Sequence, residues 1–206
     1  MIRTAVLAAA LMGGALQAHA TTITDPVGDF IPSFTGARTA DRDVVSASAS
    51  YANGVFDFGG TFNGAVGSTA GTVYVFGINR GAGTARFGAL ASGVLFDSVV
   101  IVTPNVSTVV RDFVAGTVTP LAASATTISG NSLDVMVAGA LLPSTGFSTA
   151  QYTVNLWPRS GLTDNSQIAD FAPDNSNFGV SVPEPASLAL LGVGMLGLLA
   201  VRRRTV

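Results

Sequence analysis

The chain has 206 residues, of which 48% are hydrophobic and only 11% are charged, and its formal net charge at pH 7 is −2. So few charges among so many apolar residues exclude an intrinsically disordered chain and indicate a membrane or an export route. All ten basic residues are Arg, Cys is absent, and the single His is His19, which excludes thiolate nucleophiles, zinc ribbons, P-loops and Schiff-base lysines.

Residues 1–20 have the pattern of a secretory signal peptide. One positive charge precedes an apolar run over residues 5–16, and Ala18 and Ala20 form an A-x-A site. We expect a signal peptidase to cleave after Ala20. His19 would leave with the signal, so the mature protein would lack the imidazole of a catalytic triad or of a metal site.

Residues 21–181 are predicted to form an exported domain of β-strands, because apolar and polar residues alternate in short runs between turn residues. In the first such run Val45, Ala47, Ala49 and Tyr51 alternate with serines, and the Asn53-Gly54 pair that follows predicts a type I′ hairpin turn. Further strands are expected at residues 72–78, 94–103, 108–118, 124–128, 133–137 and 152–157. The fold class is therefore all-β, an antiparallel β-sandwich of about 7–9 strands, with a short helical turn at 138–142.

The carboxylates of this domain gather near its two ends in the sequence. Between residues 21 and 182 there are eleven Asp and six Arg, a formal charge of −5. If the first and last strands are neighbours, their loops meet at one edge of the sandwich and supply oxygen ligands for calcium. The candidate calcium ligands are Asp25, Asp29, Asp41, Asp43, Asp170 and Asp174. The alternative is that these aspartates only cap turns and keep the surface soluble.

The sequence favours a non-enzymatic domain, and three other functions are weighed against it. A calcium-dependent carbohydrate-binding module would use the Asp-rich loops. An Asp-dependent polysaccharide hydrolase would need a pair of carboxylates, and nothing in the sequence singles out a pair. Ice binding is disfavoured because Thr117-Val118-Thr119 is a lone T-x-T without a repeat. No basic patch suggests nucleic acid as a partner.

Residues 182–206 have three parts in a fixed order. Val182, Pro183, Glu184 and Pro185 form a short extended motif, because proline disfavours a helix. The apolar residues 186–201 would reach about 24 Å as a transmembrane helix. A basic cytoplasmic tail, residues 202–206, begins with Arg202, Arg203 and Arg204, which would leave the rest of the chain outside the inner membrane.

A V-P-E-P motif, an apolar helix and terminal arginines resemble the PEP-CTERM sorting signal of Gram-negative bacteria. The resemblance implies recognition by an exosortase, transient anchoring in the inner membrane, and delivery to the cell surface or the extracellular matrix. It also implies an association with exopolysaccharide or biofilm. The same tail is sometimes labelled a C-terminal domain of ice-binding proteins. The middle domain is similar to a recurrent exported β-sandwich of PEP-CTERM proteins, but it has Asn79 where an Asp is expected.

Overall fold

The computed structural model describes residues 20–182. The predicted transmembrane helix at 186–201 and the predicted signal peptide, apart from Ala20, lie outside these residues. Among residues 20–182, no helix combines the length and the apolar character needed to span a membrane.

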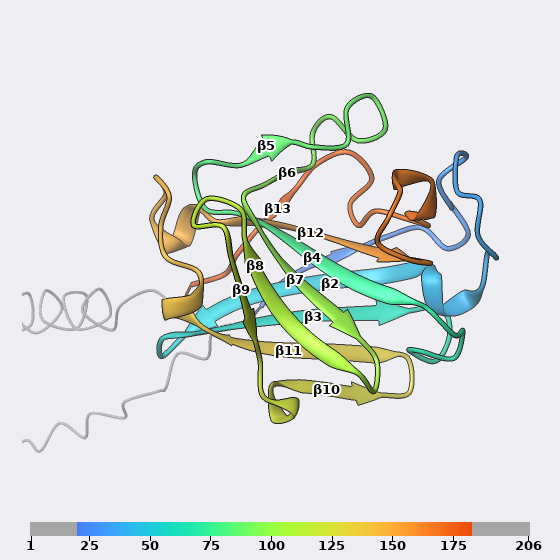
Figure 1. Ribbon diagram of the computed structural model, residues 1–206, viewed down its shortest axis with the longest axis horizontal. Helices are drawn as coiled ribbons and strands as arrows, with labels where there is room; N and C mark the ends of the chain where they lie inside the picture. The colour runs from blue at the N-terminus through green and yellow to red at the C-terminus, as the bar shows by residue number, and fades with distance from the viewer. Residues whose placement is uncertain (1–19, 183–206) are drawn as a thin grey trace, which may run out of the picture. The chain divides into compact units, whose positions relative to one another are not determined.

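The described chain folds into two main antiparallel sheets and a small ribbon (Figure 1). The first sheet has five strands in the order β1 (Thr21–Thr24), β2 (Val44–Ala52), β3 (Val55–Phe62), β11 (Ser132–Ala138) and β10 (Thr126–Ser129). The second has six in the order β13 (Phe178–Gly179), β12 (Thr153–Arg159), β4 (Val73–Asn79), β7 (Ser98–Thr103), β8 (Ser107–Asp112) and β9 (Thr117–Pro120). The ribbon pairs β5 (Thr84–Ala85) with β6 (Leu95–Phe96).

Five short 3₁₀ helices connect these strands: η1 (Ala40–Arg42), η2 (Ala123–Ala125), η3 (Gly139–Leu141), η4 (Thr149–Gln151) and η5 (Asn165–Gln167). The helix η3 falls within the helical turn predicted at residues 138–142.

The main hydrophobic core lies between the two sheets. It joins Phe56 and Phe58 of β3 and Leu133 of β11 to Phe76 of β4 and Leu156 of β12. The strand β11 alternates buried and exposed residues, so the outer face of the five-stranded sheet remains at the surface. The predicted all-β sandwich of antiparallel sheets is therefore confirmed, with more strands than the expected number.

A second core covers the opposite face of the six-stranded sheet. Every residue of β4 is buried, because loops and the β5–β6 ribbon pack on the face turned away from the first sheet, as Figure 1 shows. Trp157 of β12, 2% exposed, lies there with its ring centroid 5.1 Å from that of Phe87 and 5.2 Å from that of Phe96. These aromatic contacts hold the loop that carries Phe87 and the β5–β6 ribbon against the sheet.

The structure confirms some local predictions and corrects others. The φ angles of Asn53 and Gly54 are +52° and +81°, as the predicted hairpin requires. The inward face of β2 begins at Val44 instead of Val45, because a bulge between Val44 and Ser46 shifts the alternation. The single strand expected at 108–118 is wrong, since a turn divides it into β8 and β9.

Candidate metal centre

Asp25, Asp29 and Asp170 form a compact group of carboxylates, with one oxygen of each lying within 4.8 Å of the others. The first two follow β1, and the third lies in the loop after β12. Figure 1 shows these two loops side by side (blue and orange), and the Ile31 N–H donates a 2.9 Å hydrogen bond to the Ala169 carbonyl between them. The predicted meeting of Asp-rich loops thus occurs for three of the six candidate residues.

The turn that presents Asp29 is held by Asp43. The Gly28 N–H donates to both carboxylate oxygens of Asp43, at 2.9 and 3.1 Å. Gly28 has a φ of +86°, a conformation that favours glycine. Asp43 also accepts a 3.0 Å hydrogen bond from the Asn63 side chain, so it acts as a buried support beside the group.

Asp170 is fully buried and its orientation is fixed by two backbone donors. Its Oδ2 accepts a 2.8 Å hydrogen bond from the Val44 N–H, and its Oδ1 accepts a 2.7 Å bond from the Phe171 N–H. Asp25 is only 9% exposed, yet its Oδ2 has no hydrogen-bond partner among the described residues. Both carboxylate oxygens of Asp29 also lack a partner there.

Burial and mutual repulsion make it unfavourable for all three carboxyl groups to be ionised at once. Burial, and then the charges of Asp170 and Asp29, raises the pKa of Asp25 to about 8. Burial raises the pKa of Asp170 to about 7 despite its backbone hydrogen bonds, and burial also raises the pKa of Asp29. Within residues 20–182, no arginine forms an ion pair with any of the three. A cation between them would supply the missing charge and reverse these shifts.

The ligand atoms indicate which cation the group suits. All three are carboxylate oxygens, which favour hard cations over zinc or copper. Two ligands on opposite sides of a calcium ion lie about 4.8 Å apart, since calcium–oxygen distances are about 2.4 Å. Three carboxylate oxygens that lie within 4.8 Å of one another can therefore share one calcium ion, with carbonyls or water completing its coordination.

The remaining predicted ligands have other surroundings. Asp41 accepts 2.7 Å hydrogen bonds from the hydroxyls of Thr39 and Thr69 and a 3.3 Å bond from Thr72. Although burial alone would raise its pKa, these donors hold the pKa of Asp41 below its usual value. Asp174 is exposed, and its charge contributes to the raised pKa of Asp25 and Asp29, which places it near the rim of the group.

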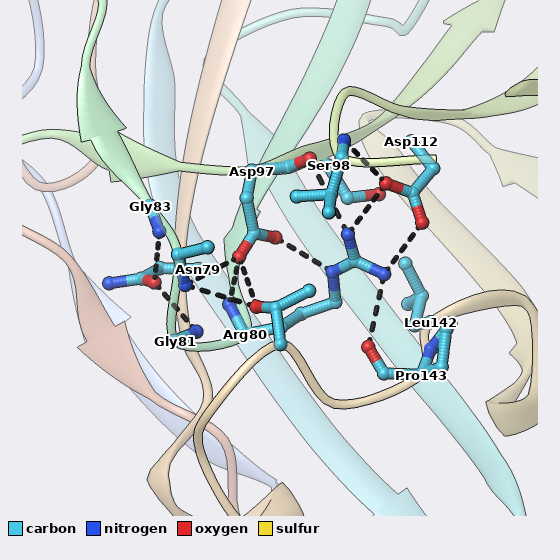
Figure 2. A network of polar contacts seen from close by, with 12 residues as sticks. Asn79, Arg80, Gly81, Gly83, Asp97, Ser98, Asp112, Leu142 and Pro143 are labelled. Atoms are coloured by element: carbon cyan, nitrogen blue, oxygen red, sulfur yellow. Dashed lines mark hydrogen bonds and ion pairs between the residues drawn. The ribbon is translucent and has the colours of Figure 1, made fainter. Parts of the chain in front are cut away.

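Two further aspartates, Asp97 and Asp112, belong to a buried ion-pair network located where β4 and β8 end and β7 begins (Figure 2). The Arg80 side chain is fully buried and donates to Asp97 at 2.7 Å and to Asp112 at 2.8 and 2.9 Å. It also donates a 3.1 Å bond to the Pro143 carbonyl. Asn79, beside it, accepts hydrogen bonds through its Oδ1 from two backbone N–H groups of the following loop.

The beginning of the predicted sorting segment belongs to the folded domain. Ser181 forms a parallel bridge with Ser50 of β2, and Val182 packs against the main core. Ala20 is exposed and immediately precedes β1, so cleavage after it would leave Thr21 as the first residue of a strand. Ala18, Pro183, Glu184, Pro185 and the arginines at 202–204 lie outside the described residues.

In a comparison with known families, residues 181–204 match the PEP-CTERM protein-sorting motif. This confirms the resemblance found in the sequence and indicates an exported protein that an exosortase processes, with membrane-associated sorting of the Gram-negative type. No curated protein and no solved structure shows significant similarity to the chain.

Proposed function

We propose that the chain is a non-enzymatic exported protein of the cell surface or extracellular matrix, whose β-sandwich binds calcium through Asp25, Asp29 and Asp170. The observation that carries this proposal is the meeting of three carboxylates, two of which, Asp25 and Asp29, have buried oxygens without a partner among the described residues, with no arginine in an ion pair with any of them there. Burying charges without compensation is costly, so a cation is the partner that fits them best.

The bound ion would join the two ends of the domain. Asp25 and Asp29 lie just after β1, whereas Asp170 precedes the segment that leads to β13. Calcium would therefore cross-link loops that are far apart in the sequence, in addition to the hydrogen bonds already present between them. Because only the folded chain brings the three carboxylates together, binding would raise the stability of the exported protein.

Thermal unfolding of the exported protein, purified from its host, tests this proposal. We expect millimolar calcium to raise the melting temperature relative to excess chelator, since calcium at about 100 times its Kd adds about 2.7 kcal/mol to the free energy of unfolding. The Asp25→Asn variant should be more stable than the wild type in chelator, because folding no longer has to protonate or bury the Asp25 carboxylate, and it should lose the response to calcium.

The Asp134→Asn variant is the matched control. Asp134 is an exposed aspartate on the outer face of β11, where it pairs with Gly59 of β3, and it is not part of the three-carboxylate group. Its replacement should leave the calcium response intact. If wild type melts at the same temperature in chelator and in calcium, the calcium proposal is wrong.

Calcium-dependent association with exopolysaccharide is a second candidate, and the position of the group favours it. The carboxylate oxygens of Asp29 are buried, but Asp174 is exposed at the rim of the group, so sugar hydroxyls would complete the coordination of an ion from that side. Stacking on Trp157, Tyr74 or Tyr152 does not contribute, since all three are buried. Sedimentation with polysaccharide from the host, in calcium and in chelator, would test the association. The hydrolase alternative gains no support from residues 20–182.

The final location is tested separately by fractionating host cells with and without a functional exosortase. We expect the protein at the surface or in the matrix in the first case and in the inner membrane in the second. Protein that stays in the inner membrane in both would contradict delivery to the surface.

A further inference from the structure

The last described residues pass from one sheet of the sandwich to the other. In β13, Phe178 and Gly179 pair with Val154 and Thr153 of the six-stranded sheet. Two residues later, Ser181 pairs with β2 of the five-stranded sheet. Residues 178–181 therefore connect the edges of the two sheets, immediately before the Pro183-Glu184-Pro185 motif in the sequence.

Three backbone groups of residues 180–182 form hydrogen bonds to the two sheets. The Val180 N–H donates to the Tyr152 carbonyl at 3.0 Å, and the Ser181 N–H donates to the Ala49 carbonyl at 3.1 Å. The Ser181 carbonyl accepts a 2.8 Å bond from the Tyr51 N–H.

The side chains add to this attachment. Val180 is 6% exposed and belongs to the main core, against which Val182 also packs. The matched sorting motif begins at residue 181, so its first two residues are part of the folded domain.

An enzyme that binds a peptide as an extended strand uses the backbone N–H and C=O groups of that peptide. The backbone groups of Ser181 cannot pair with β2 and with such an enzyme at the same time. We infer that residues 180–182 form a C-terminal latch, which must be released from the sandwich before a membrane protease can bind the Pro183-Glu184-Pro185 motif together with the residues that precede it.

A closed latch lowers the apparent affinity of the protease for its substrate. The affinity falls in proportion to the fraction of molecules with the latch open. Since opening breaks the hydrogen bonds of Ser181 and exposes Val182, that fraction is small. The fold would thus restrain the rate of processing at the point where the domain joins its sorting signal.

The test compares processing rates of the full-length chain in its host, followed by pulse–chase labelling. One variant carries a Gly-Ser-Gly-Ser insertion between Val182 and Pro183, which leaves the described contacts of the latch in place and moves the motif away from it. A second variant, Ser181→Pro, removes the N–H that donates to Ala49. The control carries the same insertion between Ala115 and Gly116, both exposed in the turn after β8.

We expect the insertion after Val182 to raise the processing rate by about tenfold, and Ser181→Pro to raise it as well, if the open fraction is on the order of one in ten. The control insertion should process at the wild-type rate. If Ser181→Pro fails to fold, the insertion after Val182 alone decides. An unchanged or slower rate for that insertion would overturn the latch, as would a wild-type chain that is not processed at all. The test is independent of calcium binding, so the two proposals can fail separately.

Discussion

The Val44 N–H donates a 2.8 Å hydrogen bond to Oδ2 of Asp170, which joins positions 126 residues apart in the sequence. This bond places the loop after β12 over the first residue of β2, and the Asp25 N–H donates to the Val45 carbonyl at 2.9 Å beside it. The start of β2 is therefore the point on which both ends of the domain converge, and the three carboxylates are held there by backbone contacts of their own loops.

In chelator, we expect the free energy of unfolding to fall as the pH rises from about 4 to about 8. The folded-state pKa is about 8 for Asp25 and about 7 for Asp170, well above the ordinary value of 3.8 expected in the unfolded chain. Across this range the folded state binds more protons than the unfolded state, so a higher pH favours unfolding. Melting temperatures measured at pH 5, 6, 7 and 8 check the sign.

Calcium should flatten this profile between about pH 6 and pH 8, because the ion replaces the protons on the carboxylates. Asp41, whose pKa lies below its usual value, acts in the opposite direction only at more acidic pH. A melting temperature that rises with pH in chelator would contradict the raised pKa of Asp25 and Asp170.

Replacing Gly28 by Ala should weaken calcium binding as well as the fold. A Cβ at this residue meets no heavy atom within 4 Å, but its φ of +86° costs an L residue about 1–2 kcal/mol. The turn would relax, and its hydrogen bonds to Asp43 and the position of Asp29 would change. Calorimetric titration with calcium and urea unfolding measure the two effects.

Gly116→Ala is the control, because Gly116 has a φ of +69° and equally open surroundings in the distant turn between β8 and β9. It should lose a similar amount of stability and keep the calcium affinity of the wild type. Equal loss of affinity in both variants would mean that Gly28 has no specific part in the site.

The sequence predicted those features of the fold that depend only on neighbouring residues. Asn53-Gly54 predicted its hairpin, because two residues with positive φ fit a type I′ turn and little else. The bulge at Val45 and the short strand β1 were missed. A bulge depends on the partner strand, and the four residues Thr21–Thr24 become a strand only through pairing with β2.

The candidate site was predicted as a region rather than as a set of ligands. Asp41 and Asp170 each follow an alanine in the sequence, and nothing local distinguishes them. In the structure, however, Asp41 accepts hydrogen bonds from Thr69, 28 residues away, whereas Asp170 lies beside Asp25. Arg80, Asp97 and Asp112 form no motif either. One sequence signal could have predicted this network. Arg80 directly follows an apolar strand and Asp97 directly precedes another, and a charge buried beside such strands needs a partner of opposite charge.

The Arg80→Met variant should lose about 3–5 kcal/mol of stability, because it leaves Asp97 and Asp112 buried without their cation. Urea unfolding measures the loss. Arg111→Met is the control, since Arg111 is exposed on β8 and its main contact is the Phe113 ring, 5.0 Å away. That contact is worth about 1 kcal/mol or less. Similar losses in the two variants would show that the network contributes no more than a surface contact.

Shortening the chain from its C-terminus should have little effect up to Val182 and a large effect beyond it. A chain of residues 21–182 keeps every contact described here, so it should unfold at the urea concentration of a host-processed protein. A chain of residues 21–177 loses Phe178 and Val180, each only 6% exposed. Each buried side chain is worth about 1.5–3 kcal/mol, so the shorter chain should lose at least about 3 kcal/mol.

The comparison also separates two views of the domain boundary. If the sandwich ended before β13, the chains 21–177 and 21–182 would unfold at the same urea concentration, and residues 178–182 would be a linker. Because Phe178, Val180 and Ser181 bond to both sheets, we expect different midpoints. A Phe178→Ala substitution in the longer chain should then reproduce part of the loss, whereas Ser176→Ala, at an exposed residue of the preceding loop, should cost less.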